Sequence, residues 1–173
     1  MDAEAWKAYR DELFALVGED DPADVQTATP ALLRERVASA GDRLRERPLA
    51  DEWSVLELAG HLADAEIFAS ARYRWVLAHD HPDLMPFDQD LLATRLHHNQ
   101  ADPDAVLALF EGLRQGNLEL WSRTSAHERA REGLHAERGP SSYEVLFREV
   151  AGHDRFHLSQ IDRTLRAVTA AAG

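Results

Sequence analysis

The chain has 173 residues, of which 45% are hydrophobic and 29% are charged, and its formal net charge is −12. This length suits one compact domain over residues 1–173, and no apolar run approaches the roughly 18 residues of a membrane span. The negative charge argues against nucleic acid and anionic membranes as partners, because both require a clustered positive patch. Cysteine is absent, which excludes disulfides, thiolate metal sites and a cysteine nucleophile. The chain begins without a signal-peptide pattern, so we expect a cytoplasmic protein.

Two helices are expected in the first third of the chain. A short N-terminal helix covers about residues 2–17, and an acidic, proline-containing connector follows over residues 18–29. Thr29 as a cap and Pro30 at the first helical position predict the start of the second helix, which Pro48 ends. Its apolar positions are spaced to share one face: Leu33, Val37, Ala40 and Leu44.

The third helix has the clearest start. Ser54 and Glu57 form a capping box, Trp53 and Leu58 are placed to make a hydrophobic staple, and the helix should continue to about Ala78. Residues 79–101 lack a sustained period and predict a long crossover loop with one irregular turn. We expect the four histidines of that loop to face the solvent: His79, His81, His97 and His98.

A fourth helix follows Asp102, which caps it ahead of Pro103 at the first helical position. A polar, glycine-interrupted segment precedes the last helix, which opens with a capping box of Ser141 and Glu144 and ends near Thr169. Four long amphipathic helices without an alternating strand pattern predict an all-α fold, a four-helix bundle with an additional short N-terminal helix. The long crossover allows consecutive helices to run parallel as well as antiparallel.

Polar residues lie on the apolar faces of two of these helices. His61 shares a face with apolar residues of the third helix at three- and four-residue steps, so its imidazole should point into the core. On the last helix the inward face reads Leu146, Glu149, Val150, His153, His157, Gln160, Ile161 and Thr164. A buried polar side chain without a partner costs about 1–3 kcal/mol, so these groups need partners.

A divalent metal ion would satisfy the imidazoles. His153 and His157 stand at i and i+4, which places their Cβ atoms roughly 5–6 Å apart, within reach of one ion about 2.0–2.1 Å from each nitrogen. His61, on a helix expected to pack against the last one, is the best third ligand. Among nine histidines one such pair also arises by chance, so the inward His61 carries the interpretation. Glu149 and Gln160 are expected to hydrogen-bond the ligand imidazoles or a neighbouring helix rather than to bind the metal directly.

Other catalytic templates are not matched by the spacing of residues. Di-iron bundles use Glu-x-x-His on two helices, and only Glu132 with His135 has this spacing, in a glycine-flanked loop. The sequence contains no His-Glu-x-x-His, Gly-x-Ser-x-Gly, phosphate-binding loop or Gly-x-Gly-x-x-Gly motif. Nucleotide-dependent chemistry and serine hydrolysis therefore lack support. Asp64, one turn beyond His61, either bonds a ligand imidazole or is a solvated carboxylate.

Two stretches of the chain stand out, residues 51–66, DEWSVLELAGHLADAE, and residues 152–161, GHDRFHLSQI. Both resemble the DinB-like (YfiT-like) metalloprotein superfamily. Residues 82–88 and 131–135 look like intervening segments of the same family, so the resemblance covers nearly the whole chain. The resemblance implies a four-helix bundle, a homodimer, and one zinc or nickel ion held by His61, His153 and His157. Zinc and nickel both accept imidazole, so the ligand types do not choose between them.

The resemblance also implies an activity. Family members with an assigned role include thiol S-transferases that use bacillithiol or mycothiol, and a mycothiol-dependent maleylpyruvate isomerase. Three neutral imidazoles leave an ion with an open position, where a thiol or a water molecule can lose a proton. The leading hypothesis is that a low-molecular-weight thiol binds the metal and is transferred or added to a small electrophilic substrate. Glu149, Gln160 or His135 would orient it or move a proton.

Two alternatives remain open. One is a metal-dependent hydrolase that uses metal-bound hydroxide at the same site, and the other is a non-enzymatic metal-binding stress-response protein. A hydrolase should be indifferent to added thiol. The non-enzymatic class is expected to lack an accessible cavity beside the metal.

Overall fold

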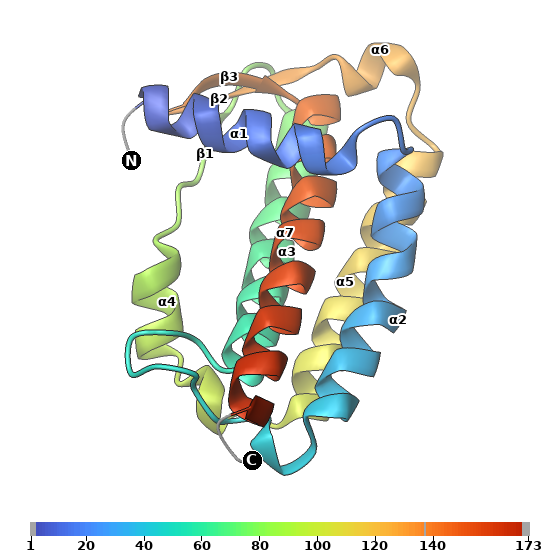
Figure 1. Ribbon diagram of the computed structural model, residues 1–173. Helices are drawn as coiled ribbons and strands as arrows, with labels where there is room; N and C mark the ends of the chain where they lie inside the picture. Colours follow the sequence, from blue (N-terminus) through green and yellow to red (C-terminus); the bar gives the residue numbers. More distant parts are fainter. Residues whose placement is uncertain (1–2, 137, 171–173) are drawn as a thin grey trace.

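The computed structural model describes residues 3–136 and 138–170 and shows a four-helix bundle (Figure 1). The four long helices are α2 (Pro22–Ala40), α3 (Val55–Ala78), α5 (Pro103–Ser122) and α7 (Tyr143–Ala170). α3 packs against both α5 and α7, and α2 contacts the same two helices. The predicted all-α bundle is thereby confirmed.

The connectivity of the bundle depends on one long crossover. α2 joins α3 through η1 (Gly41–Arg43) and a loop, and the two helices run in opposite directions in Figure 1. α3 and α5 run in the same direction, because the chain returns along the bundle between them. α7 then runs antiparallel to both. The crossover therefore permits two consecutive long helices to be parallel, as the sequence predicts.

The crossover is more structured than the single irregular turn that its composition predicts. It contains β1 (Asp83–Leu84), α4 (Gln89–Arg95) and η2 (His98–Gln100). After α5 come α6 (Ala126–Arg129), β2 (Glu132–His135) and β3 (Gly139–Ser142). β2 lies between the other two strands, parallel to β1 and antiparallel to β3. Such short strands show no alternating pattern, which explains why the sequence predicted no sheet.

Two predicted helix starts are confirmed. At α3, Ser54 Oγ accepts a hydrogen bond from Glu57 N at 3.2 Å, and Glu57 Oε2 accepts one from Ser54 N at 2.9 Å. Asp102 caps α5, and Pro103 takes its first helical position. The capping box fixes the start of α3 and thereby which of its residues, His61 among them, face the interior.

The predicted start of α2 is wrong. The helix begins at Pro22, and its cap is Asp21, whose side chain accepts a hydrogen bond from Ala23 N at 2.7 Å. Most of the expected connector, residues 18–29, is therefore helical, and Pro30 lies inside the helix. Aspartate before proline is the same start signal as threonine before proline, so the chain offers two candidate starts and the earlier one is used.

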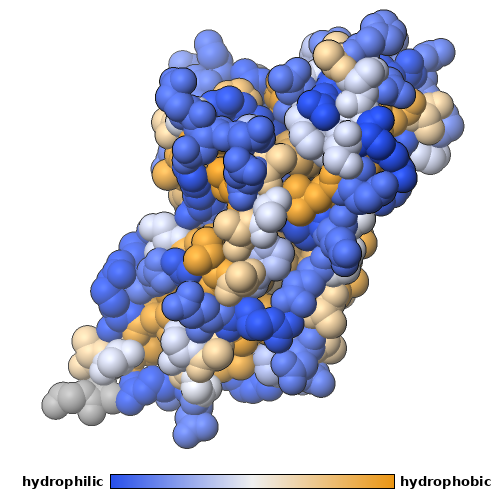
Figure 2. All heavy atoms as spheres, turned by 90° about the vertical axis from the view of Figure 1, so that its right-hand side faces the viewer, coloured by the Kyte–Doolittle hydropathy of each residue, from blue (hydrophilic) through white to orange (hydrophobic). Residues whose placement is uncertain are grey.

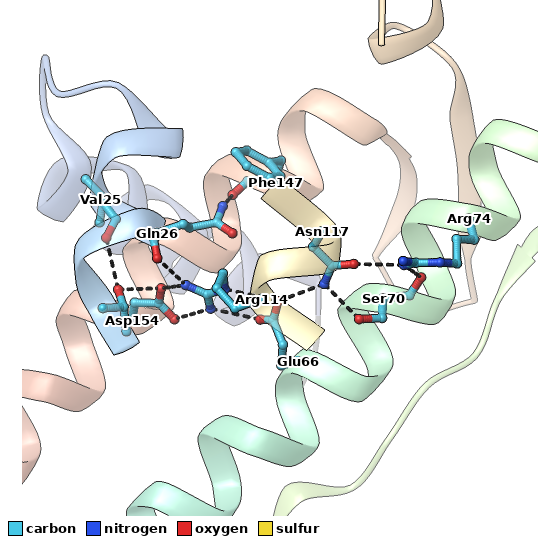
Figure 3. A network of polar contacts seen from close by, with 10 residues as sticks. Val25, Gln26, Glu66, Ser70, Arg74, Arg114, Asn117, Phe147 and Asp154 are labelled. Carbon is cyan, nitrogen blue, oxygen red and sulfur yellow. Dashed lines mark hydrogen bonds and ion pairs between the residues drawn. The ribbon is translucent and has the colours of Figure 1, made fainter. Parts of the chain in front are cut away.

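A buried polar network stabilises the helix around its internal proline (Figure 3). Pro30 has no N–H for the carbonyl of Gln26, and that oxygen instead accepts a hydrogen bond from Arg114 Nη1 at 3.1 Å. The same guanidinium binds both carboxylate oxygens of Glu66 on α3, at 3.0 and 2.8 Å, and the carboxylate of Asp154 on α7. One arginine of α5 thus connects all four long helices.

The last helix starts one residue later than predicted. α7 begins at Tyr143, and Ser142 Oγ accepts the hydrogen bond from Val145 N at 3.2 Å. Ser141 belongs to β3 instead, where it pairs with β2. The predicted capping box of Ser141 and Glu144 is wrong: both serines pair with β2, and the strand continues through Ser142 before the helix begins.

The N-terminal helix α1 (Ala3–Val17) lies across α7 near one end of the bundle (Figure 1). Gly152 permits this close approach, since a Cβ atom there would lie 2.3 Å from Leu13 O. Arg155 of α7 fixes the end of α1 by donating to Leu16 O at 2.6 Å. Trp6 and Leu13 of α1 are buried against the bundle.

Apolar side chains of the four long helices fill the centre of the bundle. One buried cluster includes Leu33, Val37, Leu58, Leu62, Phe110 and Ile161. A second includes Tyr73, Val76, Tyr143 and Phe147 of the long helices together with Leu84 of β1. Hydrophilic residues cover much of the face shown in Figure 2, with hydrophobic residues interspersed among them. Within the described part of the chain, no helix combines the length and apolar composition that a bilayer crossing requires.

Candidate metal centre

The imidazoles of His61, His153 and His157 converge inside the bundle. His61 comes from α3, and the other two come from α7, one turn apart. Nε2 of His61 lies 3.1 Å from Nε2 of His153 and 3.2 Å from Nε2 of His157. One ring nitrogen of each residue lies within 4.8 Å of the other two. The structure therefore brings together the three residues that the sequence assigns as metal ligands.

Burial favours the neutral form of all three imidazoles. It lowers the pKa of His61 to about 3, and the charges of His157 and His98 act in the same direction. Burial also lowers the pKa of His153 and of His157 well below the ordinary value, with a further contribution from the neighbouring histidine in each case. A neutral imidazole keeps the lone pair that a metal ligand must donate.

The spacing of the nitrogens fits a divalent ion. Two nitrogens that each lie about 2.0–2.1 Å from one ion, at an angle of about 90–110°, stand about 2.8–3.4 Å apart. The two measured separations, 3.1 and 3.2 Å, fall inside this range. Three neutral nitrogen ligands leave at least one coordination position open, which is the arrangement of a catalytic rather than a structural site.

Two neighbours hold the imidazoles in place. Nδ1 of His157 lies 2.9 Å from Gln160 Oε1, which can only accept a hydrogen bond, so Nδ1 carries the proton. The lone pair of His157 therefore sits on Nε2, on the side of the shared point. The ring of Trp53 packs on His61, with 5.1 Å between the ring centroids. The contact of Gln160 is the one expected from the sequence.

A small cavity of about 100 Å³ adjoins His153. α1, α3, the crossover, the β2–β3 turn and α7 all contribute to its wall. Its lining includes the aromatic residues Trp6, Tyr9 and Phe87 and the charged residues Arg72, Arg138 and Glu149. The cluster of histidines thus borders a pocket between the helices and the crossover.

Two further residues were predicted to assist catalysis. Glu149 lines the cavity together with His153, and its Oε1 is buried without a hydrogen bond to any residue the structure describes. Burial raises the pKa of Glu149 to about 7, against the opposing charges of three arginines. His135 is buried in β2 and is not among the residues that line this cavity, so its catalytic role stays a prediction.

The prediction that all four histidines of the crossover face the solvent is wrong for one of them. His98 is buried, and its Nε2 lies 2.7 Å from Asp64 Oδ2, so Asp64 bonds this ring rather than a ligand imidazole. The ring packs on Gly60, where an added Cβ atom would lie 2.5 Å from His98 Cγ. The sequence signal that pointed to this contact is Gly60 itself, because a glycine inside a helix often allows another part of the chain to pack closely against it. The other three histidines of the crossover, His79, His81 and His97, are exposed as predicted.

A solved structure shares the fold of this chain. It is the structure of YfiT from Bacillus subtilis, described as a probable metal-dependent hydrolase with an unusual four-helix bundle topology. The two structures superpose with a TM-score of 0.80, and the match covers 87% of each chain at 22% sequence identity. At this level of identity the likeness shows the fold.

Two curated relatives carry names of the same kind. "Putative metal-dependent hydrolase YfiT" of Bacillus subtilis (strain 168) is 26% identical over 143 residues, which cover 79% of this chain and 78% of that protein. "Putative metal-dependent hydrolase" of Geobacillus thermodenitrificans (strain NG80-2) is 34% identical over 85 residues, 49% of this chain and 48% of that protein. The model of the DinB superfamily matches residues 26–161, which include all three clustered histidines. The chain belongs to the DinB superfamily.

Proposed function

We propose that the protein is a metal-dependent enzyme in which His61, His153 and His157 hold one divalent cation, zinc or nickel. The observation that carries this proposal is the convergence of three neutral Nε2 atoms, 3.1–3.2 Å apart around His61, at the edge of a small cavity. The names of the relatives, which refer to metal dependence, support it. The cavity beside His153 weighs against a purely non-enzymatic metal-binding role.

The residues around the site have separate tasks in this proposal. When bound, a divalent ion with three imidazole ligands has an open position and lowers the pKa of a water molecule or thiol there. Gln160 keeps the tautomer of His157 that presents Nε2. Glu149, whose pKa lies near neutrality, accepts or returns a proton within the cavity. The apolar part of the lining excludes bulk water from the reacting groups.

The nucleophile in the leading version of the proposal is a low-molecular-weight thiol, bacillithiol or mycothiol, that adds to a small electrophile. The chain contains no cysteine, so the sulfur must come from a second substrate. Hydrolysis, with water as the nucleophile, is the second candidate, because both curated relatives are named as hydrolases. The two versions use the same residues and differ in their dependence on thiol.

Elemental analysis of protein purified without an affinity tag tests the metal site. We expect about one metal per chain in the wild type and strong depletion in His153→Ala, because loss of a ligand removes most of the affinity. The matched control is His79→Ala, which removes an exposed histidine and should keep the metal. Equal metal content in both variants would overturn the assignment of the ligands.

Thiol consumption separates the two versions of the reaction. The metal-loaded protein is incubated with a panel of small electrophiles and esters, with and without added thiol, and both thiol and product are measured. Product that requires thiol supports the transferase. Product that forms at the same rate without thiol assigns the protein as a hydrolase instead.

A further inference from the structure

The three clustered histidines are closed off from the solvent in this structure. His61 is 2% exposed and His157 is 4% exposed. The first cavity, which adjoins His153, has a volume of about 100 Å³, well below the roughly 300–1,000 Å³ of pockets that hold drug-sized molecules. A substrate of more than a few atoms can therefore reach the cluster only when one wall of the site moves.

A second cavity, with a volume of about 490 Å³, lies on the other side of His61 along α3. Glu57, His61, Ala65 and Ala69 follow one another at four-residue steps, so they form one stripe along this helix. Glu57 lines the second cavity, and Ala65 and Ala69 line the first. His61 therefore stands between the two cavities.

The crossover helix α4 contributes to the wall of both cavities. Gln89, at the start of the helix, lines the first cavity, and Ala93 and Thr94 line the second. Gln89 and Ala93 are four residues apart, so the same face of α4 borders both spaces. α4 packs on α3, and Ala93 is its buried residue. One short helix thus covers the stripe that contains His61.

The segment that contains α4 is attached to the bundle by few contacts. Residues 86–97 form no hydrogen bond or ion pair with any described residue outside the crossover. Leu91 and Leu96 are 44% and 52% exposed, so α4 buries little apolar surface. By contrast, α3 and α7 belong to the bundle, and Arg155 and the close approach at Gly152 hold α1 on α7. Residues 86–97 are therefore the wall that moves at the lowest cost in free energy.

Both ends of this segment are fixed. Before it, β1 pairs with β2, and Met85 O accepts two hydrogen bonds from Arg72, at 3.2 and 2.6 Å. After it, His98 Nε2 lies 2.7 Å from Asp64 Oδ2 on α3. His97, next to this second anchor, has a φ of 53°, in the left-handed region that residues with a side chain seldom adopt. A segment between two fixed ends, with such a residue at one of them, has the form of a hinged lid.

One aromatic contact holds the segment against the bundle. The ring of Phe87 stacks on that of Phe68 on α3, with 4.3 Å between the centroids and an angle of 14° between the planes. The guanidinium of Arg72 lies 5.4 Å from the centre of the Phe87 ring. Phe87 also lines the first cavity. Because this contact lies outside the centre of the bundle, it can break and form again while the four long helices stay packed.

We propose that residues 86–97 are a lid over the three histidines, that the stack of Phe87 on Phe68 holds the lid closed, and that its displacement joins the two cavities into one cleft that passes His61. The use of this cleft by reactants rests on the proposed function, whereas the movement of the lid does not. In that function the open cleft admits a substrate and a co-substrate, which the first cavity is too small to hold together.

The experiment measures how fast a small reagent reaches each histidine. Full-length protein freed of metal with 1,10-phenanthroline is treated with diethyl pyrocarbonate, and the modification of each histidine is followed by peptide mass spectrometry. We expect Phe87→Ala to raise the rates at His61 and His153 together by about tenfold, because it removes the aromatic contact that closes the lid. Unchanged rates would overturn the lid, and a faster rate at His153 alone would overturn the joined cleft.

Two controls separate a lid from a general loosening of the fold. Leu91→Ala shortens an exposed side chain of the same helix and should leave the rates at His61 and His153 as in the wild type. His135 is buried in β2, outside the lining of both cavities, and its rate should not change in Phe87→Ala. An equal increase at His135 would overturn the lid.

A cross-linked variant tests the lid even where Phe87→Ala fails to fold. The chain has no cysteine, so Phe68→Cys with Phe87→Cys provides two thiols that dibromobimane can join. The linked protein should be modified at His61 and His153 more slowly than the same variant before linking. Equal rates before and after linking would overturn the lid.

These rates are measured without metal, so they separate this inference from the proposed function. Rates that respond to Phe87, in a protein that contains no metal when purified, would overturn the proposed function alone. Normal metal content that is lost in His153→Ala, with rates that do not respond to Phe87, would overturn the lid alone.

Discussion

At the scale of single residues, the candidate metal centre depends on a hydrogen bond outside the cluster. Gln160 is one turn beyond His157 on α7 and accepts the proton of its Nδ1. That contact selects the tautomer in which Nε2 faces His61, and it limits rotation of the ring. Metal affinity should therefore respond to Gln160 although it donates no electron pair to the metal.

Gln160→Leu should bind metal about 10–100-fold more weakly than the wild type, which is the usual effect of removing such a contact. Gln160→Glu keeps an acceptor for the Nδ1 proton and should retain most of the affinity. Competition of each variant with a chromophoric chelator measures the dissociation constants. Affinity of the leucine variant equal to that of the wild type would show that the hydrogen bond has no such role.

Gly60 is a second residue near the histidine cluster with a specific role, because its lack of a side chain allows a close contact. Its Cα faces the ring of His98, and the ring bonds Asp64 on the next turn of α3. A methyl group at this position would have to displace the ring and lengthen the bond between the imidazole and the carboxylate. The contact links η2 to α3 one residue before His61.

Gly60→Ala should lower the free energy of unfolding by about 1–3 kcal/mol, because the added Cβ atom overpacks a buried contact. Gly112→Ala is the matched control, since no atom lies within 4 Å of the position where its Cβ atom would be. In that exposed helical position alanine should stabilise the protein by up to about 1 kcal/mol. Urea denaturation of both variants measures the difference, and equal midpoints would contradict the packing argument.

At the scale of elements, the helix starts show what a single sequence can and cannot specify. The capping box of Ser54 and Glu57 is a local signal, and the structure uses it. The start at Thr29 and Pro30 was wrong because Arg114 of α5 bonds the carbonyl that the proline leaves free. No pattern within α2 contains that information.

Arg114→Met should destabilise the protein by about 3–5 kcal/mol, because it leaves the carboxylates of Glu66 and Asp154 buried without their cation. The control is Arg34→Met, which removes an ion pair between Arg34 on α2 and Glu111 on α5. That pair is exposed and should contribute about 0–1 kcal/mol. Chemical denaturation compares the two, and a small effect of Arg114→Met would show that the buried carboxylates are neutral in the folded protein.

At the scale of the whole molecule, stability and the candidate site share the same titrating groups. Burial holds the pKa of His61 at about 3 and lowers those of His153 and His157, whereas an unfolded histidine titrates near about 6.5. Below that pH the unfolded chain binds protons that the folded chain excludes. The histidines therefore stabilise the fold above about pH 6.5, and this contribution is lost as the pH falls toward 3.

The metal-free protein should thus lose stability as the pH falls below about 6.5, by at most about 1.4 kcal/mol per pH unit for each histidine. Glu149 acts in the opposite direction, because its pKa is raised to about 7 and its contribution disappears as the pH rises. Because three histidines outweigh one glutamate, the net effect is a loss of stability as the pH falls. Urea denaturation at a series of pH values measures it. His153→Gln should flatten the dependence, whereas His79→Gln should leave it unchanged.

The sequence predicted the cluster of three histidines more completely than the cavity beside it. His61, His153 and His157 lie on strongly periodic helices, so their inward direction follows from spacing alone. Arg72 and Arg138 gave no such signal, because arginine on a helix or in a glycine-flanked turn is usually solvated. Their shared cavity exists because α1 and the crossover pack over them. Neither contact can be predicted from the residues that neighbour the two arginines in the sequence.

The position of α1 across α7 has a consequence for how the site is assembled. Arg155 and Leu16 are 139 positions apart in the chain, so a growing polypeptide displays the first helix long before its docking surface has been synthesised. During that interval Trp6 and Leu13 remain without the contacts that bury them in the folded protein. A chain that stops short of α7 therefore has neither the wall that α7 gives the pocket nor the histidine pair.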